Sequence, residues 1–125
     1  VGPGFKNKKV LKNISNKITI KNHPKSLMKE FSKNDLLISG GGITAFESVA
    51  SGLPTMIIAT ERHEIKNAKF LEKIGCAVYV GYRKSFDFKN KFKTIDIRKM
   101  STNGLHKVKV NGSENIFKII NQMEN

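Results

Sequence analysis

Three consecutive glycines are the feature of this sequence that most directly suggests chemistry. Gly40–Gly42 follow the short apolar run Leu36–Ser39 and precede a stretch typical of a helix, Ile43–Ser51. The first turn of a helix carries N–H groups without a helical acceptor and about half a unit of positive charge. Glycines beside it let a phosphate approach the backbone, because no Cβ stands in the way. The pattern predicts a diphosphate cradle, with a tight glycine turn as the alternative. The predicted cradle residues are Gly41, Gly42, Ile43 and Thr44.

Glu47 is the second residue of this stretch that could bind a ligand. The spacing Thr44-x-x-Glu47 fits a capping box, in which the glutamate only accepts a hydrogen bond from the backbone at the helix start. If the helix instead begins near Gly42, Glu47 lies one turn into it, on a polar side. That side comprises Thr44, Glu47, Ser48 and Ser51, and the core side comprises Ile43, Phe46 and Ala50. A carboxylate there, just past a bound diphosphate, can accept both hydroxyls of a ribose.

The same stretch also matches a dinucleotide-binding fingerprint. Gly40-x-Gly42-x-x-Ala45 fits the pattern G-x-G-x-x-[G/A], and the acidic Glu61 follows about 20 residues later, after a predicted strand. Two features count against this interpretation. The fingerprint normally opens its domain, whereas a strand and a helix are predicted before it here, and it leaves Glu47 without a role. A Rossmann NAD-binding module is therefore the alternative.

The charge of the chain is strongly positive. It carries 23 Lys and Arg against 10 Asp and Glu, a formal net charge of +13. Such an excess suits an anionic partner, such as nucleic acid, acidic lipid or a phosphorylated small molecule. The lysines are scattered along the sequence, and aromatic residues do not alternate with them as on a surface that stacks single-stranded bases. We interpret the charge as a solvated surface. A basic nucleic-acid-binding domain is the second alternative, and nucleic acid is not the expected partner.

Length and composition limit the class of protein. The 125 residues, 38% of them hydrophobic, suit a single domain over residues 1–125 with one core. No apolar run approaches the roughly 20 residues of a membrane helix, and no signal peptide is visible. Cys76, the single cysteine, lies in an apolar run and is expected to be a buried thiol. We expect a cytoplasmic protein without a membrane span, a metal site or a cofactor.

The spacing of apolar residues predicts alternating strands and helices. Strands are expected at Lys17–Lys21, Leu36–Ser39, Thr55–Ala59 and Cys76–Val80. Helices are expected at Phe5–Ile14, Pro24–Ser32, Ile43–Ser51, His63–Ile74, Asp96–Thr102 and Ser113–Met123. The middle strands are apolar throughout, which is typical of a parallel sheet covered on both faces. The predicted fold is therefore α/β, a doubly wound, Rossmann-like parallel sheet. Ligands in such sheets bind at the carboxyl ends of strands, near a switch in strand order.

Two longer segments together resemble a known family. S-G-G-G-I-T-A-F-E-S-V-A-S-G-L-P-T-M-I-I and H-E-I-K-N-A-K-F-L-E-K-I-G-C-A are similar to the C-terminal domain of GT-B-type nucleotide-sugar enzymes. The pattern there is a serine-and-glycine loop, a helix bearing Glu, a G-x-P turn, a strand and a Q-x-x-N-A helix. The nearest resemblance is to the UDP-sugar hydrolase of pseudaminic acid synthesis and to spore-coat polysaccharide proteins. The peptidoglycan N-acetylglucosaminyltransferase is more distant. The resemblance covers about residues 17–81 well and the rest loosely.

The resemblance implies a role for each matching residue. The glycine loop would hold the diphosphate of a UDP-sugar, and Glu47 would bind its ribose. Asn22 and His23 would meet the uracil edge, through backbone groups, and Glu64 and Asn67 would lie toward the sugar. Glu64 departs from the family pattern, in which Gln stands at this position. An ionised Glu cannot donate a hydrogen bond, and it would repel a diphosphate.

The resemblance also implies a missing half. In the two-domain relatives the catalytic base comes from an N-terminal domain, and the reaction occurs between the domains. The opening V-G-P-G-F resembles the end of a strand and its turn. We therefore expect a fragment or C-terminal domain of a two-domain enzyme. It would be part of a hydrolase or glycosyltransferase of surface-polysaccharide or nonulosonic-acid synthesis. In isolation it would bind a UDP-sugar without turnover, because the base is supplied by an N-terminal domain or a separate subunit.

Overall fold

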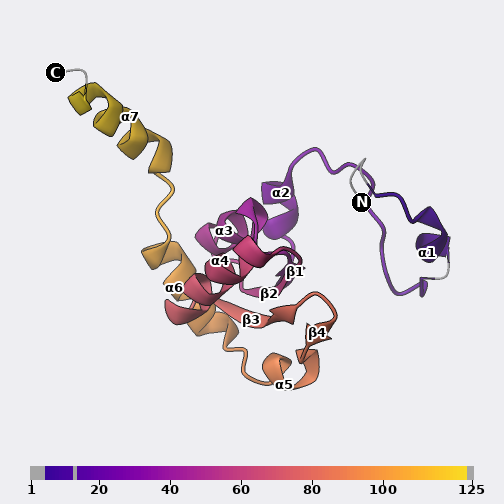
Figure 1. The fold of residues 1–125 in the computed structure, drawn as a ribbon. Helices are drawn as coiled ribbons and strands as arrows, with labels where there is room; N and C mark the ends of the chain where they lie inside the picture. The colour runs from indigo at the N-terminus through magenta and orange to yellow at the C-terminus, as the bar shows by residue number, and fades with distance from the viewer. Residues whose placement is uncertain (1–4, 13, 124–125) are drawn as a thin grey trace.

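The computed structural model describes residues 5–12 and 14–123, and it has an α/β fold around one open sheet. Three parallel strands lie side by side, β1 (Leu37–Ser39), β2 (Thr55–Ala59) and β3 (Ala77–Tyr82). The short β4 (Ser85–Phe86) pairs antiparallel with β3, so the sheet has the order β1-β2-β3-β4 (Figure 1). The predicted α/β class with a mostly parallel sheet is confirmed.

Seven helices accompany these strands within the described residues. They are α1 (Lys8–Lys12), α2 (Leu27–Phe31), α3 (Ile43–Ala50), α4 (Arg62–Lys73), α5 (Phe88–Phe92), α6 (Ile97–Lys107) and α7 (Gly112–Met123). The predictions for β2, α3, α4 and α7 are confirmed to within about one residue at each end. Strand β3 and helix α6 are present but extend further than predicted. Strand β4 and helix α5 were not predicted, because two strand residues and a five-residue helix leave no measurable periodicity.

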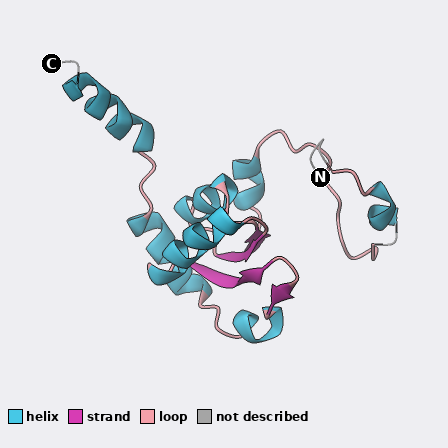
Figure 2. Ribbon diagram, in the orientation of Figure 1, coloured by secondary structure: helices cyan, strands magenta, loops and turns pink. Residues whose placement is uncertain are grey.

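The core lies between the sheet and two crossover helices. The units β1–α3–β2 and β2–α4–β3 advance in the same direction along the sheet, so right-handed connections place α3 and α4 on the same face (Figure 2). The buried cluster between them comprises Ala45, Val49, Ile57, Ala68, Leu71, Cys76 and Ala77. Cys76 is a buried thiol as predicted, and burial raises its pKa although Lys107 works in the opposite direction.

Helix α3 turns a different side to the core from the one predicted. Its buried residues are Ala45, Ser48 and Val49, whereas Ile43 is 78% exposed. Ser48 can lie inside because its hydroxyl donates to the Ala45 carbonyl oxygen (2.9 Å) and contacts the Thr55 hydroxyl (2.7 Å). These small and hydrogen-bonded residues bring the helix close to the sheet. Of the predicted polar side, Glu47 is exposed, whereas Ser48 is buried.

The predicted strand Lys17–Lys21 is wrong. The segment opens with a turn, in which the Ile18 N–H donates to the Ser15 carbonyl oxygen (2.9 Å). Its apolar residues Ile18 and Ile20 do not pack against the sheet, since both are exposed. Strict alternation over five residues did not outweigh this local turn. Among the described residues β1 is therefore an edge strand, and the expected switch in strand order does not occur beside it.

The two helices before β1 are shorter than predicted. Helix α1 covers only part of Phe5–Ile14, and the expected strand end at residues 1–4 lies outside the described residues. Helix α2 begins at Leu27 rather than Pro24, because Ser26 is its N-cap and accepts a hydrogen bond from the Lys29 N–H (3.4 Å).

Helix α7 projects away from the sheet and the other helices (Figure 1). All its residues are exposed, including an apolar series at Ile116, Phe117, Ile119, Ile120 and Met123. No helix in the described part of the chain is both long and apolar enough to cross a membrane.

The crossing of α6 over α3 depends on Gly104. A Cβ at this position would collide with the backbone oxygen of Val49. Gly104→Ala should therefore lower the free energy of unfolding by about 1–3 kcal/mol, although alanine favours an isolated helix. Gly112→Ala is the matched control, because nothing lies within 4 Å of the added methyl group. Urea unfolding monitored by circular dichroism makes the comparison. Equal stability of the two variants would show that α6 and α3 are not in close contact.

Candidate functional site

The carboxyl ends of the parallel strands bring three loops to one edge of the sheet. Gly40–Gly42 follow β1, Thr60 and Glu61 follow β2, and Arg83 follows β3. The Arg83 side chain donates from Nε to the Thr60 carbonyl oxygen (3.1 Å), which ties the last two loops together. This edge is where an open parallel sheet normally binds its ligands.

The start of α3 decides between the two interpretations of Glu47. Gly42 is the N-cap, in an extended conformation with φ −84° and ψ −161°, and Ile43 is the first helical residue. Thr44 is therefore inside the helix, and the predicted Thr44–Glu47 capping box is wrong. The amides of Ile43 and Thr44 belong to the first turn and have no helical acceptor. The first turn of α3 thus leaves these two amide donors beside the glycine loop.

Glu64, on the first turn of α4, packs directly against this loop. A Cβ added at Gly41 would lie 2.6 Å from the Glu64 carbonyl oxygen and 2.8 Å from its Cβ. A Cβ added at Gly40 would lie 3.2 Å from Oε1 of the same carboxylate, and one at Gly42 would lie 3.6 Å from it. Gly41 is buried. The absence of a side chain at Gly41 is therefore needed for helix packing, whether or not a ligand binds.

The Glu64 carboxylate is held by several hydrogen bonds. Oε2 accepts from the Thr60 N–H (2.7 Å), the Thr60 hydroxyl (3.0 Å) and the Glu61 N–H (3.3 Å). Burial acts to raise the pKa of Glu64. Hydrogen bonds from the Thr60 and Glu61 amides, the Thr60 hydroxyl and the Gly41 amide outweigh it, so the pKa lies below its usual value of 4.5. An ionised carboxylate thus lies inside the glycine loop at neutral pH.

Asn67 fixes the other side of the loop. Its Nδ2 donates to the Gly41 carbonyl oxygen (2.8 Å), so Asn67 and the backbone of Glu64 both hold α4 against Gly41. The sequence predicted that Glu64 and Asn67 lie near the glycines, toward a sugar. The structure brings them to Gly41, and each has a role there that needs no ligand.

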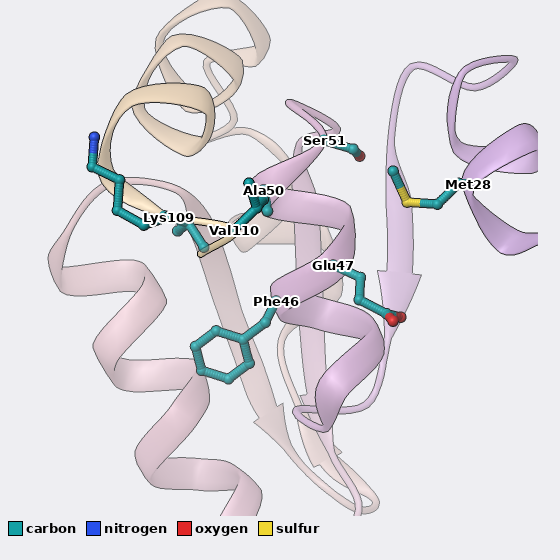
Figure 3. A pocket seen from close by; sticks show the side chains of 8 residues that line it. Met28, Phe46, Glu47, Ala50, Ser51, Lys109 and Val110 are labelled. Atoms are coloured by element: carbon teal, nitrogen blue, oxygen red, sulfur yellow. The ribbon is translucent and has the colours of Figure 1, made fainter. Parts of the chain in front are cut away.

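Glu47 lies on the wall of a solvent-open hollow over the exposed surface of α3. The hollow has a volume of about 390 Å³ and is lined by Met28, Phe46, Glu47, Ala50, Ser51, Val108, Lys109 and Val110. Figure 3 shows Phe46 and Glu47 leaving α3 on opposite sides, with Met28 on the side of Glu47. The wall is mainly apolar. A flat, partly apolar group with hydroxyls at one end suits such a surface.

The remaining predicted site residues lie elsewhere. Asn22 and His23 are in the exposed stretch between α1 and α2, where His23 has a φ of 49°. In the described part of the chain, no hydrogen bond joins either residue to the glycine loop. Neither of them lines the hollow that contains Glu47. Their contact with uracil stays a prediction.

Thr60 and Arg83 belong to this edge, and the sequence did not predict them. Arg83 has a φ of 52°, which few non-glycine residues adopt. Its guanidinium lies over the Tyr82 ring (5.1 Å) and 3.7 Å from the Glu61 carboxylate. The signal that could have identified both is their position directly after an apolar strand, as for the glycines.

Glu61, the acid of the NAD-type fingerprint, is exposed at the start of α4. Its ion pair with Arg83 gives it a role without any nucleotide. Among the described residues, no group of three or more His, Cys, Asp or Glu side chains is arranged to hold a metal ion.

Comparisons of the chain with protein-family models, with curated proteins and with solved structures gave no match. The function proposed below is therefore argued from the residues of the glycine loop and of helices α3 and α4.

Alanine substitutions at two neighbouring glycines test whether the loop packs against α4. Gly41→Ala should lower the free energy of unfolding by about 1–3 kcal/mol, because its methyl group meets the Glu64 backbone. Gly42→Ala should change it by less than about 1 kcal/mol, since its φ suits alanine and its nearest contact is 3.6 Å. Thermal unfolding provides the measurement. Equal losses of stability would mean that the loop does not pack on α4 as described.

Proposed function

We propose that this chain is the UDP-sugar-binding domain of a nucleotide-sugar hydrolase or glycosyltransferase, used in surface-polysaccharide or nonulosonic-acid synthesis. Its Rossmann-like sheet would correspond to the C-terminal half of a GT-B fold. The observation that carries the proposal is the order of features along one helix. A glycine loop at the carboxyl end of β1 leads into α3, and the exposed Glu47 follows one turn later beside the hollow.

This order matches the order of groups in a nucleoside diphosphate. The first-turn amides of Ile43 and Thr44 suit the diphosphate, since they are unpaired donors at the positive end of the helix. Glu47 follows Ile43 by four residues, or about 6 Å along the helix axis. Its two carboxylate oxygens suit the two adjacent hydroxyls of a ribose. The apolar part of the hollow, with Met28 and Phe46, is available to the base.

The reaction would occur where the sugar leaves this surface. In a hydrolase, water displaces the nucleotide at the anomeric carbon, and the N-terminus of α3 stabilises the negative charge of the departing UDP. The carboxylate nearest the loop, Glu64, already accepts hydrogen bonds from Thr60 and Glu61, and its pKa lies below the usual value, so it is a weak general base. We infer that the catalytic base comes from another domain or subunit, so that this domain alone binds without turnover.

Calorimetric titration with UDP tests the ribose contact. Glu47→Gln keeps the shape of the side chain and removes its charge. It should weaken UDP binding about 10- to 100-fold, because hydrogen bonds to a charged group are worth about 1.5–3 kcal/mol. In the wild type 2′-deoxy-UDP should bind correspondingly more weakly than UDP, whereas Glu47→Ala, which has no acceptor on its side chain, should bind the two ligands alike.

Two controls accompany this titration. Glu114→Gln, on the projecting helix α7, removes one acid far from the glycine loop and should leave UDP binding unchanged. NAD tests the alternative module, in which Glu61→Ala weakens binding. Equal affinity of the wild type for UDP and 2′-deoxy-UDP would contradict the role of Glu47. Saturable binding of NAD that depends on Glu61 would replace the proposed function with the alternative.

A further inference from the structure

The Glu64 carboxylate lies against the glycine loop that precedes helix α3. Glycine loops before helices attract negative groups, because their amides are exposed and the helix dipole adds positive potential. Here the negative group is the protein's own. The Glu64 carboxylate lies beside the loop, since its Oε1 would be 3.2 Å from a Cβ added at Gly40 and 3.6 Å from one added at Gly42.

We propose that Glu64 determines how well this loop accepts phosphate, because its carboxylate occupies the inner part of the loop and a diphosphate must displace it. This inference deepens the proposed function and rests on it. A phosphate and an ionised carboxylate cannot share one amide without close repulsion between like charges. The Glu64 carboxylate lies beside Gly40 and Gly42, on the loop that a ligand would otherwise use.

Displacing the carboxylate also breaks contacts within α4. Glu64 is the third residue of this helix, and it reaches back to the Glu61 N–H, as the acid of a capping box does. The Thr60 amide and hydroxyl lose their acceptor as well. Ligand binding must therefore offset both the repulsion and the loss of these hydrogen bonds. The phosphate groups of a ligand therefore contribute less to its affinity than they would in the same loop without the Glu64 carboxylate.

Glu64→Gln removes the charge and keeps most of this arrangement. The amide oxygen of Gln can still accept from Thr60 and Glu61, and its NH₂ group can donate to a phosphate. The variant should therefore fold like the wild type and present a loop without an internal anion. It should bind inorganic diphosphate and UDP at least about tenfold more tightly, while its affinity for uridine stays the same.

The matched control is Glu61→Gln, three residues away on the same turn. It lowers the number of acids by one and so raises the net charge equally. However, the Glu61 carboxylate points to Arg83 (3.7 Å) rather than into the loop. Its affinity for inorganic diphosphate should stay within about threefold of the wild type, because an exposed ion pair of this kind is worth little.

The experiment is a calorimetric titration of the wild type, Glu64→Gln and Glu61→Gln with inorganic diphosphate, UDP and uridine at one salt concentration. Thermal unfolding confirms that each variant is folded. If Glu64→Gln unfolds, Glu64→Ser is a shorter neutral replacement that makes the same test. A gain in affinity for diphosphate and UDP that is specific to the position-64 variant supports the proposal. Equal gains in both variants would mean that only net charge matters, and would overturn it.

Titrations with the different ligands test the role of Glu64 and the nucleotide function independently. If UDP binds the wild type and Glu64→Gln equally well, the nucleotide site stands and the role of Glu64 is wrong. If inorganic diphosphate binds more tightly only in Glu64→Gln, and UDP gains nothing over it, the role of Glu64 stands and the nucleotide function fails. If neither anion binds any variant, both are wrong.

Discussion

The contact between Glu64 and the glycine loop is the interaction on which the rest of this edge depends. It joins the β1–α3 unit to the start of α4 at Gly41, which lies against the Glu64 backbone and whose carbonyl oxygen accepts from Asn67. Because Gly41 has no side chain, the backbone of α4 can lie directly against the loop.

The same contact links stability to function. A loop that binds an anion has exposed N–H donors beside a helix start. Without a ligand, these unpaired donors lower the stability of the fold. A carboxylate from the neighbouring helix neutralises part of the positive potential at this helix start. The consequence is competition, since any phosphate that enters meets a charge already in place. On this view Glu64 stabilises the empty loop and reduces its affinity for a phosphate.

The elements that flank the site were predictable from the sequence because their signals are local and consistent. Strand β2 is apolar except for Thr55, and α4 is followed by Gly75, which has a φ of +74°. The side of α3 that faces the core was not predictable, because the buried Ser48 is stabilised by Thr55, a partner on the next strand. Lys17–Lys21 has the alternation of a strand, yet a turn at Ser15 and the exposure of Ile18 override it.

The candidate site shows the same division. The glycines and Glu47 could be identified from spacing, because a loop and the helix after it are continuous in sequence. Thr60 and Arg83 reach the site only through pairing of β2 and β3, which places their loops at one edge. The approach of Glu64 to Gly40–Gly42 is also tertiary. Its sequence signal was only the presence of an acid where the related pattern has glutamine.

The most direct test of this account is the ¹⁵N–¹H spectrum of the domain during titration with UDP. Saturating UDP should shift the amide resonances of Gly41, Gly42, Ile43 and Thr44 most, because the diphosphate accepts hydrogen bonds from these amides. The Thr60 amide should shift with them as Glu64 leaves. Shifts spread over the exposed lysines, with these amides unmoved, would contradict the account and would mean that the glycines serve only to pack α4 against the loop.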